Sequence, residues 1–190
     1  MAKTEVSLSR SLRLIEHGPV VLITTEARGV PNIAACSWLM PAAPEPPTLA
    51  LSLGAGSQTR RNLEDRGEFA LNVPPRSLAR ETHFCGKVSG REVRKERETG
   101  LRLEPAGKVR APLVTACVGH LECVVRDARP VGHQVLYLAE VVLALAEGDL
   151  FDETWNTDDE RARTLHHLGG DLYTSPGRRV PIDLQRVPAW

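Results

Sequence analysis

The segment Gly54–Asn62 carries the side chains best suited to bind a small anion. It reads GAGSQTRRN, so two glycines that let the backbone approach a ligand precede hydroxyl, guanidinium and amide groups. The segment follows an expected strand and opens an expected short helix, whose first turn offers unpaired N–H groups and a favourable dipole. Ser57, Thr59 and Asn62 suit a phosphate monoester in this setting. An ordinary Ser-capped helix with solvated Arg60 and Arg61 would explain the same residues, and spacing alone does not decide between the two.

A second segment, Asn32–Trp38, could hold a planar group. On a strand, alternate residues share one face, so Ala34 and Cys36 lie between the amide of Asn32 and the indole of Trp38. Small residues flanked in this way would form a shallow slot for a flat ring. A core strand with a tryptophan buried for packing is the alternative.

The other polar candidates each have a plain structural explanation. His133 lies in a Gly-His turn, and Lys95 lies in the charge run Arg91–Glu98, which by default is a solvated face. His166 and His167 would complement the dipole at the end of a helix. No Ser/His/Asp or Cys/His order and no marked pair of carboxylates stands out.

Short β-rich segments bounded by turn residues predict an antiparallel architecture. The first two expected strands form a hairpin, and the Pro-rich stretch 41–47 is expected to be a loop. No long helices alternate with the strands, which disfavours a parallel βαβ sheet, and no GxGxxG follows a strand, so a Rossmann nucleotide site is not expected. The expected strands cover residues 19–25, 32–40, 48–53, 68–73, 113–126 and 134–146.

Three helices are expected around this all-β barrel or sandwich. The first is Gln58–Asp65, with Ser57 as N-cap and Gly67 just past its end. The second covers Arg76–Phe84. The third is Asp158–Leu168, which has acidic residues in its first turn and two glycines after its end.

Composition fits one soluble, cytoplasmic domain. Lys plus Arg and Asp plus Glu are each 24 in 190 residues, so the net charge of zero favours neither nucleic acid nor an anionic membrane as partner. The start of the chain does not resemble a signal peptide, and the longest apolar run, Val135–Ala146, is interrupted by Glu140 and too short to span a bilayer. The cysteines form no CxxC pair and are expected to be buried free thiols: Cys36, Cys85, Cys117 and Cys123.

Taken in order, several segments resemble one known family. PVVLITT, NIAACSW and PPTLALSLGAGSQTRRNLEDRGEFALNV are followed by FCGKVSGREVRKERETGL, VGHLECVV, VGHQVLYLAEV and HHLGGDLY. Together, from about Pro19 to Tyr173, they resemble the flavin reductase-like, FMN-binding split-barrel family, which includes flavoredoxins. The resemblance implies a single domain over 1–190: a mainly β, six-stranded antiparallel Greek-key split barrel (about 15–150), then a C-terminal helix and tail (151–190). It also implies a homodimer with FMN near the subunit interface.

The resemblance further implies which residues bind FMN, with the chemistry on the flavin rather than on a catalytic side chain. Near Lys95 the chain reads Arg-Lys-Glu-Arg where related sequences often have Asp-Lys-Phe. No metal is implied. The cofactor-binding residues would be Asn32, Ala34, Ser37, Trp38, Ser52, Ser57, Gln58, Thr59, Asn62, Lys95, His133 and Tyr173.

The implied activity is an NAD(P)H-dependent flavin reductase that passes hydride or electrons through bound FMN, with NADH or NADPH as donor. One alternative is a flavoredoxin-type electron carrier that serves a redox partner protein without strong NAD(P)H activity. Another is a non-catalytic FMN-binding module. A pyridoxamine-phosphate-oxidase-like enzyme would share the barrel, but its substrate-phosphate arginines are not evident.

Overall fold

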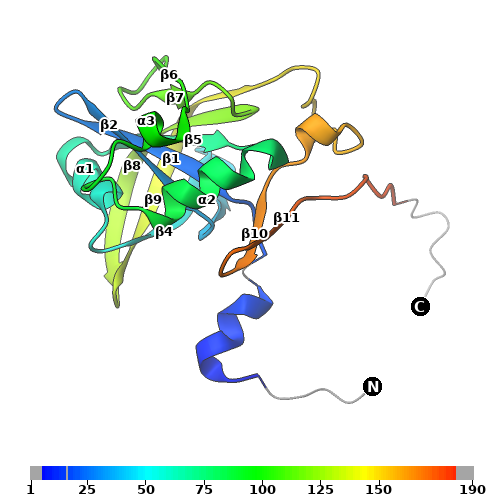
Figure 1. The fold of residues 1–190 in the computed structure, drawn as a ribbon, viewed down its shortest axis with the longest axis horizontal. Coiled ribbons are helices and arrows are strands. Elements are labelled where there is room, and N and C mark those ends of the chain that lie inside the picture. The colour runs from blue at the N-terminus through cyan, green and yellow to red at the C-terminus, as the bar shows by residue number, and fades with distance from the viewer. Residues whose placement is uncertain (1–5, 16, 183–190) are drawn as a thin grey trace.

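The computed structural model describes residues 6–15 and 17–182, and its centre is a seven-stranded antiparallel sheet (Figure 1). The strand order is β2-β1-β5-β8-β9-β4-β3, so neighbours in space are often distant in sequence. Two short two-stranded sheets, β6–β7 and β10–β11, lie outside it. The strands are β1 (Val21–Ala27), β2 (Val30–Cys36), β3 (Leu39–Ala43), β4 (Thr48–Gly54), β5 (Glu68–Val73), β6 (Leu103–Glu104), β7 (Leu113–Val114), β8 (Gly119–Val131), β9 (Gln134–Ala146), β10 (His166–Gly169) and β11 (Leu172–Thr174).

The expected mainly β architecture is confirmed, with seven strands in the main sheet rather than six. The extra strand arises because the single strand expected over 32–40 is two, β2 and β3, separated by Ser37 and Trp38. β3 continues through Pro41 to Ala43, so only residues 44–47 of the expected Pro-rich loop form a turn. Proline is tolerated there because β3 is an edge strand and needs no N–H donor on its free side.

Both faces of β1 are buried, which places this strand between two apolar layers. Its Val21 and Ile23 belong to the main core, together with Phe69 and Leu71 of β5. On its other face, Leu22 packs in a second cluster with Ile33, Cys85, Leu101, Val114 and Cys117. The helix α2 therefore covers the outer face of the β1–β2 hairpin, as the ribbon shows (Figure 1).

Two of the three expected helices form. In α1, Ser57 Oγ accepts from the backbone N–H of Arg60 at 3.1 Å, and Gly67 ends the helix with a φ of 66°. The second begins as a 3-10 turn and continues as α2. None of the helices in the described residues is long and apolar enough to cross a membrane. The helical elements are η1 (Leu8–Leu14), α1 (Gln58–Arg66), η2 (Arg76–Leu78), α2 (Ala79–Lys87), α3 (Lys95–Thr99) and η3 (Glu160–Ala162).

The prediction of a C-terminal helix over Asp158–Leu168 is wrong. Only the 3-10 turn η3 forms, and the chain then runs extended into β10. Backbone pairing with the body of the protein explains this: Leu165 donates its N–H to Pro74 O at 3.2 Å and accepts from the N–H of Val20 at 2.8 Å. The Leu165 side chain is buried at the same point. Tertiary pairing and burial thus outweigh the helical end signals in the sequence.

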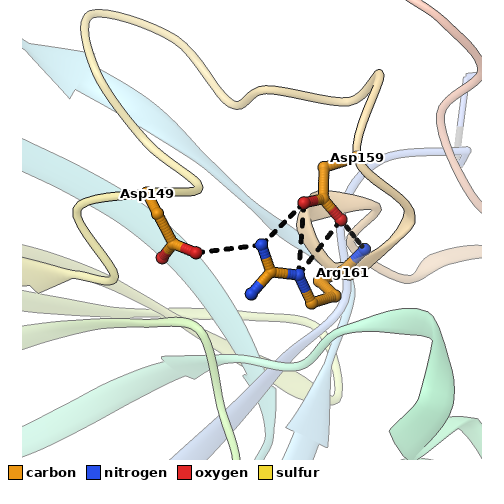
Figure 2. Close-up of polar contacts among 3 residues, drawn as sticks. All are labelled: Asp149, Asp159 and Arg161. Atoms are coloured by element: carbon orange, nitrogen blue, oxygen red, sulfur yellow. Dashed lines mark hydrogen bonds and ion pairs between the residues drawn. The ribbon is translucent and has the colours of Figure 1, made fainter.

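Exposed ion pairs accompany this C-terminal segment. Figure 2 shows the guanidinium of Arg161 between Asp149 and Asp159. Arg161 Nη2 lies 2.9 Å from Asp149 Oδ2 and 2.7 Å from Asp159 Oδ2, and more than half of the Arg161 side chain is exposed. Such pairs contribute little to stability, because solvent screens both charges.

Candidate functional site

A cavity of about 460 Å³ opens where β2, the end of β4 and the first turn of α1 meet the segment that follows α2. Among residues 6–15 and 17–182 no aspartate or glutamate lines it, whereas hydroxyl, amide and ammonium groups do. We call it the first cavity. Most of the residues predicted as cofactor-binding line it: Asn32, Ala34, Ser37, Trp38, Ser52, Ser57, Gln58, Thr59 and Lys95.

A buried hydrogen bond joins β2 to α1 in the wall of this cavity. Asn32 Nδ2 donates to Thr59 Oγ1 at 3.0 Å, and both residues are buried. Because the threonine hydroxyl accepts this bond, its own hydrogen is left to donate to another acceptor. Asn32 therefore makes Thr59 a donor toward a ligand with acceptor oxygens.

The other amide atom of Asn32 is also informative. Asn32 Oδ1 is buried and has no hydrogen-bond partner among the described residues. It lies against the backbone of Gly90, where a Cβ would overlap it. A buried polar atom without a partner is costly, so this part of the cavity wall is suited to a bound donor.

Asn62 lies below the cavity wall rather than in it. Its Nδ2 donates to Thr25 Oγ1 at 3.0 Å, and its Oδ1 accepts from Gln58 Nε2 at 2.7 Å. Both amide atoms are thus used within the protein. The structure gives Asn62 the role of anchoring α1 to β1.

Lys95, the first residue of α3, brings a buried cation to the cavity. It is 4% exposed, and its Nζ donates to Cys85 O at 2.6 Å. Among the described residues no carboxylate pairs with it, and burial lowers the pKa of its ammonium. The charge run was compatible with a fully solvated face, but α3 turns this lysine inward. A buried cation bonded only to a carbonyl is strongly stabilised by a bound anion.

The arginines near α1 do not supply the cavity's positive charge. Arg60 donates to Ala55 O at 2.6 Å and pairs with Glu64. Arg61 is exposed, and neither arginine lines the cavity. Arg91 instead donates to Gly56 O, which ties the segment after α2 to the loop before α1.

Two further predicted residues lie outside the first cavity. His133 is exposed in the β8–β9 turn, where its backbone oxygen accepts from the N–H of Ala55 at 3.0 Å, and its neighbour Gln134 lines the cavity instead. Tyr173, on β11, lines a second cavity of about 340 Å³. The two cavities adjoin, because both are lined by Ala35, Cys36, Ser37, Gly86 and Lys87.

Sequence reasoning missed several lining residues. Gln134 and Gly90 lie within segments that resemble the family, but neither was assigned a role, and the importance of Gly90 arises from its contact with Asn32. His83 and Lys87 lie four residues apart and project from one face of α2, which runs to Lys87. The expected helix ended at Phe84, so only His83 lay within it and the shared face was not predicted.

The cysteines are buried free thiols, as expected. Cys36 and Cys85 line the first cavity, and burial raises the pKa of each thiol to about 11. Both are therefore protonated at neutral pH and act as small apolar wall residues.

Comparisons with known proteins bear on the family of this chain. Residues 14–166 match the family described as flavin reductase like domain. The uncharacterized protein YddH of Escherichia coli K12 is 34% identical over 180 residues, which cover 92% of this chain and 95% of that protein.

Solved structures share the fold over nearly the whole chain. A flavoredoxin from Methanosarcina acetivorans superposes with a TM-score of 0.84 at 21% identity, over 98% of this chain and 97% of that one. An FMN-binding domain of a flavin reductases-like enzyme from Shewanella baltica OS155 gives a TM-score of 0.80 at 27% identity, over 95% and 97% of the two chains. The fold is thus the expected split barrel, and the chain belongs to the flavin reductase-like domain family.

Proposed function

We propose that this protein binds FMN in the first cavity and acts as an NAD(P)H-dependent flavin reductase. The observation that carries the proposal is that the described residues lining the cavity include no carboxylate but do include a buried ammonium, that of Lys95, and a threonine hydroxyl that is left to donate. These donors suit the dianionic phosphate of FMN. The family match and the likeness to an FMN-binding domain of a flavin reductases-like enzyme support the same cofactor.

The residues divide between the two ends of the cofactor. Ser57, Thr59, the first N–H groups of α1 and Lys95 would hold the phosphate, because they supply donors and charge. Ala34, Ser37 and Trp38 would lie beside the flavin ring, with Ser52 and Gln58 on the adjoining wall. Asn32 and Asn62 would act as positioning residues through their bonds to Thr59 and Gln58.

When bound, FMN supplies the capacity to accept a hydride or to pass electrons singly. The protein's part is to bind and orient it. Lys95 and the α1 N-terminus offset the phosphate charge, and the half-exposed indole of Trp38 covers apolar surface at the cavity edge. No side chain is assigned a catalytic role.

The cofactor is tested by isolating the protein and releasing what it carries. The purified protein should be yellow, and denaturation should release FMN rather than FAD, because the first cavity offers one phosphate-sized donor cluster. Chromatography of the released material identifies the flavin. Mainly FAD, or a colourless protein that takes up no FMN, contradicts the proposal.

Activity is tested by anaerobic stopped-flow mixing of the FMN-loaded protein with NADH and with NADPH. Rapid bleaching of the flavin absorbance is expected for a reductase. Absence of bleaching would favour a flavoredoxin-type carrier, the second candidate, which the likeness to flavoredoxin supports. If a reduced electron-transfer protein also fails to reduce the bound flavin, the remaining possibility is a non-catalytic FMN-binding module.

We further infer that the protein is a homodimer. An apolar groove of about 750 Å³ is lined by Leu39 and Met40 of β3 together with Leu49, Leu71 and Val141. Met40 is 62% exposed, and the groove begins directly after Trp38 of the first cavity. A second copy seated on this groove would cover apolar surface beside the cofactor. Light scattering of the FMN-loaded protein should give twice the chain mass, and a mass near 20.8 kDa would refute the dimer.

A further inference from the structure

The second cavity has a lining unlike that of an ordinary surface hollow. It lies between α2, the end of β2 and the β10–β11 hairpin, and it encloses about 340 Å³. Within the part of the chain that the structure describes, no aspartate or glutamate lines it, and each of its polar side chains can donate a hydrogen bond. The apolar part of the wall comes from Val20, Ala35 and Cys36. The polar side chains are Ser37, His83, Lys87, His167 and Tyr173.

Several of these donors are held in place by one another. Tyr173 Oη lies 3.1 Å from His83 Nδ1, and the two rings meet edge to face at 5.7 Å between centroids. Behind them, Asp171 Oδ1 lies 2.7 Å from Lys87 Nζ and 3.8 Å from His83 Nε2. The carboxylate thus pairs with both side chains at the solvent-exposed edge and does not itself line the cavity.

The cluster can present a hydroxyl donor to a ligand. In the imidazolium form of His83 both ring nitrogens donate, Nδ1 to Tyr173 Oη and Nε2 toward Asp171, and the phenol hydrogen is then free to donate into the cavity. A ligand with acceptor oxygens favours this form over the neutral form in which Tyr173 donates to His83 Nδ1. The ammonium of Lys87 adds a positive charge at the same wall.

We propose that the second cavity binds a small planar organic anion, an aromatic carboxylate, through Tyr173, His83 and Lys87. A donor-rich, carboxylate-free wall next to apolar side chains fits a ring that bears an oxyanion. The volume is at the lower end for ligand pockets and suits one ring with its carboxylate rather than a dinucleotide. This deepens the proposed function and rests on it, because a ligand here would lie beside the flavin cavity as a substrate or its analogue.

The inference also separates Tyr173 from the FMN site. Tyr173 and His83 line only the second cavity, whereas Thr59 and Lys95 line only the first. Between the cavities, α2 approaches β2 so closely that a Cβ at Gly86 would lie 3.3 Å from Ala35 Cβ. Substitutions at Tyr173 and at Thr59 should therefore affect two different ligands.

The test uses calorimetric titration of the FMN-loaded protein with benzoate and with its neutral analogue benzamide. Benzoate should bind at least 10-fold more tightly than benzamide. Tyr173→Phe and His83→Phe should each weaken benzoate binding by about 10-fold, the loss expected for one hydrogen bond to a charged group. The FMN dissociation constant of Tyr173→Phe should match that of the wild type.

A charge variant provides an independent readout. Lys87→Gln should reduce the preference for benzoate over benzamide, and Lys87→Arg should restore most of it. The matched control is Lys108→Gln, because Lys108 is exposed and lines neither cavity. This variant should leave the affinities for benzoate and benzamide unchanged. Near-ultraviolet circular dichroism checks that each variant is folded.

Three results would overturn the inference: equal binding of benzoate and benzamide, benzoate binding that is unchanged in Tyr173→Phe and Lys87→Gln, or release of FMN by benzoate. The last would show that the second cavity belongs to the cofactor. Failure of the proposed function looks different, because it is a failure to take up FMN at all. Benzoate titration of such flavin-free protein would still decide whether the second cavity binds the anion.

Discussion

Polar side chains are buried around α1 but exposed in the C-terminal segment. Around α1, buried amide and hydroxyl groups are bonded within the protein, as Asn32 is to Thr59 and Asn62 is to Thr25. In the C-terminal segment, charged groups pair on the surface, as Arg161 does with its two aspartates (Figure 2). The buried hydrogen bonds fix the positions of side chains beside a cavity. The surface ion pairs lie on a segment whose position depends on other contacts.

Those other contacts are the backbone bonds of Leu165 and those of its buried side chain. Burial of an apolar side chain therefore keeps the C-terminal segment folded. Around α1, buried hydrogen bonds position the groups that could bind a ligand.

The largest effect is expected for Leu165→Ala. Removing this fully buried side chain should lower the free energy of unfolding by about 2–5 kcal/mol, because the contacts of the segment are lost and a cavity remains. Urea unfolding measures the change. The matched control is Leu168→Ala in the same segment, where the leucine is 43% exposed and should cost much less. Equal effects of the two variants would mean that burial does not hold the segment.

Next is Lys95→Met, which keeps the length of the side chain and removes its charge. FMN affinity should fall by about 2–3 kcal/mol, or 30- to 150-fold, because the phosphate loses a charged donor. Fold stability should not fall, since burial of the ammonium is itself unfavourable. Fluorescence titration measures the affinity, with Lys108→Met as the control. An unchanged affinity would place the phosphate elsewhere.

Thr59→Ala should weaken FMN binding by about 1–3 kcal/mol through loss of one hydrogen bond to the phosphate. Trp38→Ala should also weaken it, by loss of apolar contact near the ring. Thr154→Ala, at an exposed threonine outside both cavities, is the control for the hydroxyl deletion. The same titration applies, and normal FMN affinity in both site variants would contradict the assignment of the first cavity.

A smaller effect should accompany pH. Burial lowers the pKa of Lys95, so above this lowered pKa the folded protein has lost a proton that the unfolded chain still holds. The flavin-free protein should therefore gain stability as pH rises from that value toward the ordinary lysine pKa. A bound phosphate favours the charged ammonium, so FMN affinity should fall over the same interval. Titration at several pH values should show this decline in the wild type and not in Lys95→Met.

The smallest effect is expected for Arg161→Ala. The guanidinium and both partner carboxylates are solvent-accessible, so the midpoint of urea unfolding should not change measurably. A clear loss of stability that disappears at high salt would show that the ion pairs hold the segment after all. Polar contacts would then hold both regions in place, and the two would differ only in how strongly.

Much of this contrast could be predicted from local sequence, and the rest could not. Ser57 and Gly67 mark both ends of α1 because caps act within a few residues, and the β8–β9 hairpin follows from two β-rich runs around one turn. The C-terminal helix was wrong because Leu165 pairs with residues about 90 and 145 positions away, which no local signal reports.

In the candidate site, too, some placements could be predicted from local sequence and others could not. Residues on β2 and at the start of α1 are brought together as their spacing suggested, since each lies on an element that was correctly expected. Three placements depend on how α2, α3 and β11 pack: the inward turn of Lys95, the internal hydrogen bonds of Asn62, and the position of Tyr173 in the adjoining cavity. Those placements follow from tertiary contacts rather than from residue type.

The contact between Gly90 and Asn32 also bears on how this site can evolve. Because a Cβ at residue 90 would overlap Asn32 Oδ1, a side chain there requires the Asn32 amide to move or to be replaced. Either change would disturb the hydrogen bond from Asn32 to Thr59. Among descendants of a common ancestor, glycine at one position and asparagine at the other should therefore be inherited as a pair, and their joint loss should mark proteins that no longer hold a ligand in the same way.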